Sequence, residues 1–263
     1  MIKFFRKIRY DYMGTGKTGK YLKYAIGEIV LVVMGILIAL SINNWNHKQK
    51  EIEKESISLN NLVLDLEEQF ELLEEYILIE SNYYENGISI LRHYAKHNGF
   101  VNMDSIYPKL NSIATRKTFN PINTTFIELK STGNISLIQN ENLKRSIIRY
   151  YHELERTTIV VTNNNTNLVD GIYNSILIKS TLYASDIDDI AMTTMNKSIF
   201  ELEELKELQK TSELVLSNPE VSLSLFNALE NRISVALGHK DSYVQLKKET
   251  RGLIHLIKLE IDN

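Results

Sequence analysis

The feature that most constrains this chain is an apolar run near its N-terminus. Between Ala25 and Ile42 lie eighteen residues in which Glu28 is the single charged side chain, and no further charge occurs from Ile29 to Asn46. A helix of that length, at about 1.5 Å per residue, nearly matches a hydrocarbon core about 30 Å thick. The run therefore predicts a transmembrane helix, because the core helices of soluble proteins are usually shorter.

The residues around the run indicate how it sits in a membrane. Tyr21 and Tyr24 precede it and Trp45 follows it, where aromatic rings prefer the lipid headgroups. Residues 1–45 hold seven of the 30 Lys and Arg and two of the 33 Asp and Glu, a net charge of +5, whereas the other 218 residues carry 23 basic and 31 acidic side chains. Since basic flanks stay in the cytoplasm, we expect the N-terminus inside and the acidic remainder outside.

A cleaved signal peptide is the competing interpretation of the same run. The basic leader is long, the run exceeds the usual length of about 7–15 residues, and no A-x-A site follows Leu40. We therefore expect an uncleaved signal anchor with three parts: a basic cytoplasmic or interfacial tail at residues 1–22, a transmembrane helix at 23–46 and a helical-bundle domain at 47–263.

One face of the predicted membrane helix carries mostly small side chains. The positions recur at spacings of four, and they are Gly27, Leu31, Gly35 and Ala39. Such a stripe permits close approach of another helix, and Glu28 borders it, which predicts a partner-facing surface. The alternative is that Glu28 is solvated at the membrane edge, with Lys23 as the nearest base. The residues alone leave both open.

The tail combines apolar and basic side chains, as peptides on anionic lipid surfaces do. The residues expected at the membrane surface are Lys3, Phe4, Phe5, Arg6, Lys7 and Arg9. The segment from Gly14 to Lys20 resembles a phosphate-binding loop, but the pattern ends on Tyr21 and a membrane helix follows it. We expect neither nucleotide nor nucleic-acid binding, because the tail is short and the larger domain acidic.

The rest of the chain is predicted to form long helices. Six Gly and three Pro in 218 residues are too few for the turns of a sheet-rich fold. Apolar residues recur at steps of three and four from Leu59 to Ala95, interrupted by Glu80, then over 143–172 and over 219–257. We expect an all-α protein in which the single N-terminal transmembrane helix continues into an elongated helical bundle.

Residues that typically begin or end helices support the same assignment. Gly99 predicts the end of the first, Asn140 and Glu141 the start of the second, and Asn218 with Pro219 the start of the third. Between the first two, residues 118–142 predict a compact helix-turn-helix insertion that caps the bundle. It has a turn at 119–121 and a short helix around 126–129 that ends near Gly133. The Asn-rich segment 163–167 leaves three alternatives open, namely a polar layer in the core, a loop that splits the helix, or a ligand site.

Three stretches of the chain resemble one family. They are the leader MIKFFRKIR, the anchor GKYLKYAIGEIVLVVMGILIALSINNWN and the segment FNPINTTFIELKSTGNISLIQNENLKRSIIRYY, together about a third of the chain. The sequence is similar in them to a family of single-pass membrane proteins of unknown function from Bacteroidota. The resemblance implies a bacterial inner-membrane protein with a periplasmic helical domain and supplies no activity. It also favours a partner-facing surface at Gly27, Glu28 and Gly35.

No residue pattern indicates catalysis, a cofactor or a metal. His93 and His97 share a helix face, but a zinc site needs further ligands and the chain has no Cys and no HExxH motif. His239 looks isolated. We therefore expect no enzyme activity. The predicted function is a membrane-anchored periplasmic scaffold or accessory subunit whose partners are the bilayer and another protein or a second copy. The alternative is a periplasmic ligand sensor that relays through its membrane helix to a separate output subunit.

Overall fold

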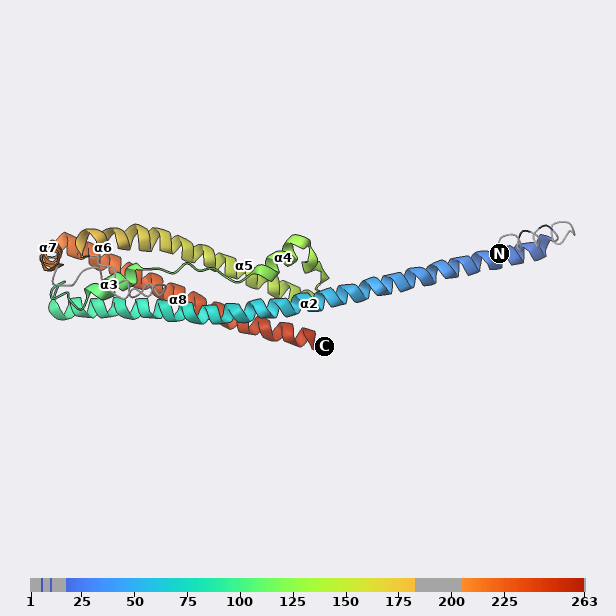
Figure 1. The fold of residues 1–263 in the computed structure, drawn as a ribbon, viewed down its shortest axis with the longest axis horizontal. Coiled ribbons are helices and arrows are strands. Elements are labelled where there is room, and N and C mark those ends of the chain that lie inside the picture. The colour runs from blue at the N-terminus through green and yellow to red at the C-terminus, as the bar shows by residue number, and fades with distance from the viewer. Residues whose placement is uncertain (1–5, 7–9, 11–17, 183–204, 263) are drawn as a thin grey trace. The chain divides into compact units, whose positions relative to one another are not determined.

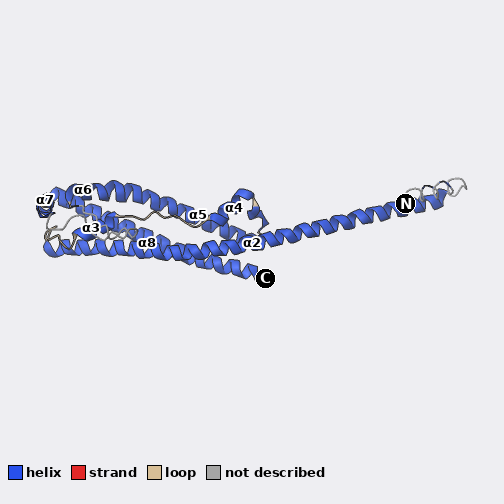
Figure 2. Cartoon of the chain, in the orientation of Figure 1, coloured by secondary structure: helices blue, strands red, loops and turns tan. Residues whose placement is uncertain are grey.

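The computed structural model describes residues 6, 10, 18–182 and 205–262, and packing divides the chain into two units, Met1–Ile57 and Ser58–Asn263. Within the described residues all regular structure is helical and no strand occurs (Figure 2). The all-α prediction is confirmed. The predicted boundary after residue 46 marks the end of the apolar run, whereas the division at Ile57 marks where tertiary packing begins.

Helix α2, Thr18–His97, begins in the first unit and ends in the second. The predicted continuation of the N-terminal apolar helix into the bundle is therefore confirmed. Residues 23–46, here called the anchor segment, are exposed along their whole length apart from a half-buried Ala25. One helix among the described residues is long and apolar enough to cross a membrane, and none of its apolar window is buried within the chain.

The second unit is built on three long helical stretches (Figure 1). The first is the C-terminal part of α2. The second is α5, Glu141–Asn164, which continues through the π-helical segment η2, Asn165–Asn174, into α6, Ser175–Ser180. The third is α8, Pro219–Ile261. Contacts such as Glu67 with Lys258 and Gly87 with Ile233 show that α8 runs antiparallel to α2.

Shorter helices connect the long ones. They are α3 (Tyr107–Ala114), α4 (Thr124–Thr132), the 3-10 helix η1 (Asn134–Leu137) and α7 (Lys206–Leu216). Helix α4 is the predicted short helix between the first two long ones. Helix α3 was not expected, because eight residues are too few to show a helical period.

The predicted helix ends follow local chemistry. The Asn218 side chain accepts a hydrogen bond from the Glu220 N–H at 2.9 Å and caps α8, with Pro219 in the first turn. The Asn140 side chain accepts from the N–H groups of Asn142 and Leu143, both at 3.1 Å, and caps α5. At the end of α4, Gly133 has φ 74°, a left-handed conformation that favours glycine.

The core of the bundle consists of two apolar clusters. The first joins α2 up to Tyr76, α5 up to Val161 and α8 from Tyr243 onward. The second joins α2 from Ile90, the π-helical segment and α6 at Tyr173 and Leu177, and α8 up to Leu229. On each of the three long stretches, a short interval separates the positions that belong to the two clusters.

The residues of α2 that are buried in the bundle form its buried seam. At several positions the buried residue is the neighbour of the predicted one. Beside Leu59, Leu66 and Leu73, which were expected, the seam contains Leu62, Gln69, Tyr76, Glu80, Gly87 and Ile90. Ala95, predicted on the seam, is exposed. The polar members are accommodated by partners: the Gln69 side-chain oxygen accepts from the Ile122 N–H at 2.7 Å. At Gln69 and Gly87 the prediction followed the apolar neighbours Phe70 and Ile88, because it counted apolar residues only.

Candidate functional site

The predicted membrane-helix interface lies entirely on the surface of the first unit. Its members Gly27, Glu28, Leu31, Gly35 and Ala39 are all exposed on α2. A Cβ atom added at Gly27 or Gly35 would meet nothing within 4 Å. Among the described residues nothing covers this face, so there the surface is open to lipid or to another helix.

The other predicted membrane contacts are only partly described. Arg6 is helical and exposed, and the side chains of Tyr24 and Trp45 are exposed near the two ends of the apolar run. Tyr21 lies on α2, and its side chain is outside the described residues. The remaining tail residues predicted at the membrane surface also fall outside them, namely Lys3, Phe4, Phe5, Lys7 and Arg9.

In the second unit, four polar side chains meet in the interval between the two core clusters. We call Glu80, Asn164, Arg232 and His239 the polar layer. Glu80, Arg232 and His239 are only 5%, 2% and 1% exposed. They come from α2, α5 and α8, so the layer joins all three long stretches. Charged side chains are almost never buried to this extent without partners.

The contacts of His239 assign its tautomer. Its Nδ1 atom lies 3.2 Å from Glu80 Oε1, and its Nε2 atom lies 3.2 Å from the Asn164 amide nitrogen. A carboxylate only accepts and an amide nitrogen only donates, so Nδ1–H donates to Glu80 and Nε2 accepts from Asn164. The neutral imidazole satisfies both contacts. His239, which looked isolated in the sequence, is thus the centre of the layer.

Arg232 extends the layer to the C-terminal end of α3. Its Nε–H donates to the Ile113 carbonyl at 2.8 Å, and its guanidinium stacks 4.5 Å from the centre of the Tyr83 ring. Glu80 Oε2 is 3.8 Å from Arg232 Nη1, an ion pair in which neither of these two atoms has a hydrogen-bond partner. Burial lowers the pKa of Arg232, and the Glu80 carboxylate opposes that effect.

The π-helical segment starts directly after the layer. Asn165, its first residue, is 3% exposed, and the chain is helical throughout 163–167. The alternative of a loop that splits the helix is therefore wrong, and a polar layer in the core fits. A ligand at these residues stays a prediction. π-Helical turns widen a helix locally and are frequent at functional sites.

The arrangement is suited to holding helices together rather than to chemistry. The carboxylate and imidazole of the layer are closed off from solvent, and no serine, threonine or cysteine hydroxyl or thiol is recorded in contact with His239 among the described residues. No three His, Asp or Glu side chains converge on a metal position in the part of the chain that the structure describes. The predicted pair His93 and His97 stacks at 4.3 Å, and His93 Nε2 lies 2.8 Å from the Val101 carbonyl.

Comparison with known proteins gives one match. A family of unknown function, DUF6090, matches residues 28–183. The matched region takes in most of the apolar run together with Glu80 and Asn164, and it ends before Arg232 and His239. No curated protein and no solved structure matches the chain.

Proposed function

The chain belongs to DUF6090, a family of unknown function, and from its geometry we propose that it is a membrane-anchored periplasmic interaction subunit. In this proposal it acts as a scaffold or accessory component of a membrane complex. The observation that carries the proposal is the anchor segment, whose apolar side chains are not covered by any part of the chain that the structure describes.

In this proposal the lipid bilayer surrounds the exposed apolar side chains of the anchor segment. Exposed members of the segment include Ile29, Leu31, Val32, Leu37 and Ile38. Contiguous apolar surface of this kind is unfavourable in water at about 25 cal/mol per Å², and the hydrocarbon core removes that penalty. The length of the apolar run suits one crossing. The basic tail and acidic bundle support an orientation with the N-terminus in the cytoplasm and the bundle in the periplasm of a bacterial inner membrane.

The orientation has a direct test. A reporter pair fused after Asn263, one member active only in the periplasm and the other only in the cytoplasm, is expected to be active in the periplasmic form alone. The physical reason is the excess of Lys and Arg before the apolar run. Replacing the four bases Lys7, Arg9, Lys17 and Lys20 by Gln is expected to shift a measurable fraction to the cytoplasmic form. Activity of the cytoplasmic reporter in the unaltered chain would reverse the proposed topology.

A partner of the anchor segment is proposed from its small-residue face. At Gly27 and Gly35 a neighbouring helix can approach the backbone closely, since no atom of the described residues lies within 4 Å of an added Cβ atom. Glu28 borders the same face, and a carboxylate among apolar residues is stabilised by a polar contact from another helix. This face favours a second membrane helix, from another protein or from a second copy of the chain.

The partner proposal is tested by substitutions on the two faces. Gly35→Leu and Glu28→Gln are expected to reduce recovery of the partner several-fold in pull-downs from native membranes in mild detergent, because one blocks approach and the other removes the charge. Val33→Leu adds bulk about 200° away around the helix and is the matched control, with recovery as in the wild type. All variants should stay in the membrane fraction. Equal recovery with Gly35→Leu and Val33→Leu would refute the proposed interface.

A further inference from the structure

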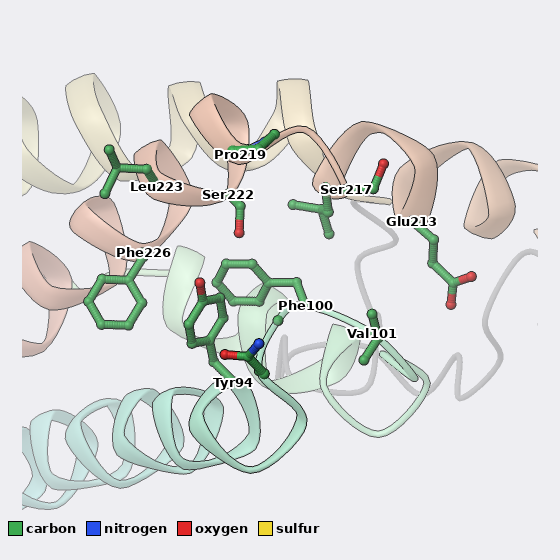
Figure 3. Close-up of a pocket in the computed structure, with 12 residues that line it drawn as sticks. Tyr94, Phe100, Val101, Glu213, Ser217, Pro219, Ser222, Leu223 and Phe226 are labelled. Carbon is green, nitrogen blue, oxygen red and sulfur yellow. The ribbon is translucent and has the colours of Figure 1, made fainter.

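A hollow opens at the end of the bundle where α2 and α7 end and α8 begins (Figure 3). Its volume is about 550 Å³, within the range of about 300–1,000 Å³ that small-molecule sites occupy. Side chains from α2, the following loop, α7 and α8 line it. The hollow lies outside the polar layer and the anchor segment, so neither of the functions discussed above accounts for it.

Three aromatic rings form one wall of the hollow. The Tyr94 ring lies 4.7 Å from the Phe100 ring and 5.2 Å from the Phe226 ring, and both pairs are inclined by 59°. Figure 3 shows Tyr94 and Phe226 facing the space from opposite helices. Phe100 is buried, whereas Tyr94 and Phe226 are half-buried and remain accessible. The faces of such rings carry partial negative charge and attract cations.

The charge around the hollow has the same sign as the ring faces. Glu213 is exposed and is the one charged side chain among the described residues that line it. Helices α2 and α7 both end here, but they add little negative charge. The last turn of α2 carries Lys96 and His97, and the last carbonyl groups of α7 already accept hydrogen bonds from Ser217 and Asn218, so the negative charge at the hollow comes from Glu213. The opposing N-terminus of α8 is already capped by the Asn218 side chain and carries Glu220 in its first turn.

We propose that this hollow binds a small organic cation with an apolar body, such as an aryl- or alkylammonium compound. The cationic head and the carbons attached to it lie over the accessible faces of Tyr94 and Phe226, and Glu213 adds negative charge from the other side of the hollow. The inference goes beyond the proposed scaffold function and does not depend on it, because it concerns the second unit alone. A bound ligand at this place would supply the input that a sensing protein requires.

The probe for the test is benzyltrimethylammonium, titrated into the full chain in nanodiscs of zwitterionic lipid and followed by ligand-observed NMR, with empty nanodiscs as the blank. For a ligand of this size we expect saturable binding with a dissociation constant of about 1 mM. Phenylacetate, an anion of similar shape, and benzyl alcohol, which is neutral, are expected to bind at least about fivefold more weakly.

Two substitutions distinguish the contribution of the Glu213 charge to binding from that of the aromatic rings. Glu213→Gln is expected to weaken binding about fivefold, and Phe226→Leu, which keeps apolar volume and removes the ring face, about threefold to fivefold. Glu230→Gln removes an exposed acid of α8 that does not line the hollow and should leave binding unchanged. Glu213 is exposed, so its variant is expected to fold even where Phe226→Leu does not.

Three outcomes would overturn the proposal. They are no saturable binding to the wild type, binding of phenylacetate or benzyl alcohol as strong as that of the cation, and equal affinities of Glu213→Gln and Glu230→Gln. Equal binding of the neutral probe would identify the hollow as an apolar docking site without preference for charge. None of these outcomes bears on the membrane pull-down, which tests the anchor segment separately.

Discussion

Replacing Arg232 by Met is expected to lower the free energy of unfolding of the bundle by about 3–5 kcal/mol. Methionine has a similar length, so the main change is the loss of the buried charge. Glu80 would remain 5% exposed without its guanidinium partner, and the Ile113 carbonyl would lose its 2.8 Å donor. An unpaired buried charge is far more costly than the pair is favourable, which sets the size of the effect.

The measurement is urea unfolding of the full chain in mild detergent, followed by far-ultraviolet circular dichroism. Lys258→Met is the matched control, because Lys258 pairs with Glu67 on the same two helices at 2.7 Å and both side chains are half exposed. The control should cost at most about 1 kcal/mol. Equal losses in the two variants would show that the polar layer is no more important than a surface ion pair.

A second substitution tests whether the layer acts as a pair. Glu80→Leu combined with Arg232→Met removes both charges and is expected to recover part or all of the lost stability, since apolar replacements of buried ion pairs are often neutral or better. The double variant would then be stable but less specific in the register of α2 against α8. That register determines which face of α2 packs in the bundle, and α2 is also the helix that contains the anchor segment.

Gly87→Ala is expected to destabilise the bundle by about 1–3 kcal/mol, although alanine is the better helix former. A Cβ atom at Gly87 would lie 2.4 Å from Cγ1 and 3.0 Å from Cδ1 of Ile233. Ile233 is buried and branched at Cβ, so it cannot leave its rotamer without disturbing its neighbours. The close approach of α2 and α8 at this level requires the absence of a side chain.

The matched control is Gly252→Ala on α8, where an added Cβ atom meets nothing within 4 Å. There the substitution should stabilise by about 0.5–1 kcal/mol through helix propensity alone. In an Ile233→Ala background, Gly87→Ala should likewise become neutral or stabilising. The same urea titration reports both. A stabilising effect of Gly87→Ala in the otherwise unaltered chain would contradict the contact between Gly87 and Ile233.

Local sequence patterns predicted most of the helical architecture. The apolar run indicated α2 in the first unit, and Asn140, Gly133 and Asn218 marked helix ends that the structure confirms. Each of these is decided within one or two turns of chain, where capping groups and backbone conformation act directly. The small-residue face of the anchor segment was one of two interpretations that the spacing left open, and the structure leaves it exposed without testing its partner.

The polar layer could not be assembled from local patterns. Glu80 was recognised as an interruption of the apolar seam, but its partners lie 152 and 159 positions away in the chain. Arg232 and His239 are seven residues apart, so they share one face of α8 with the apolar seam. Steps of three from Leu229 and Ala236 reach Arg232 and His239, a spacing that could have suggested polar positions on the α8 seam opposite Glu80. The register that brings them together depends on the whole bundle.

The hollow at the α2–α7–α8 end of the bundle depends on tertiary structure for the same reason. Tyr94, Glu213 and Phe226 come from three helices that are brought together only when the connecting segments fold back. Helix formation, helix ends and the exposed apolar anchor follow from interactions within a few residues, so the amino-acid sequence reveals them directly. Which polar side chains are buried, which glycine permits close packing and where a cavity opens depend on long-range contacts, whose free energies local patterns do not contain.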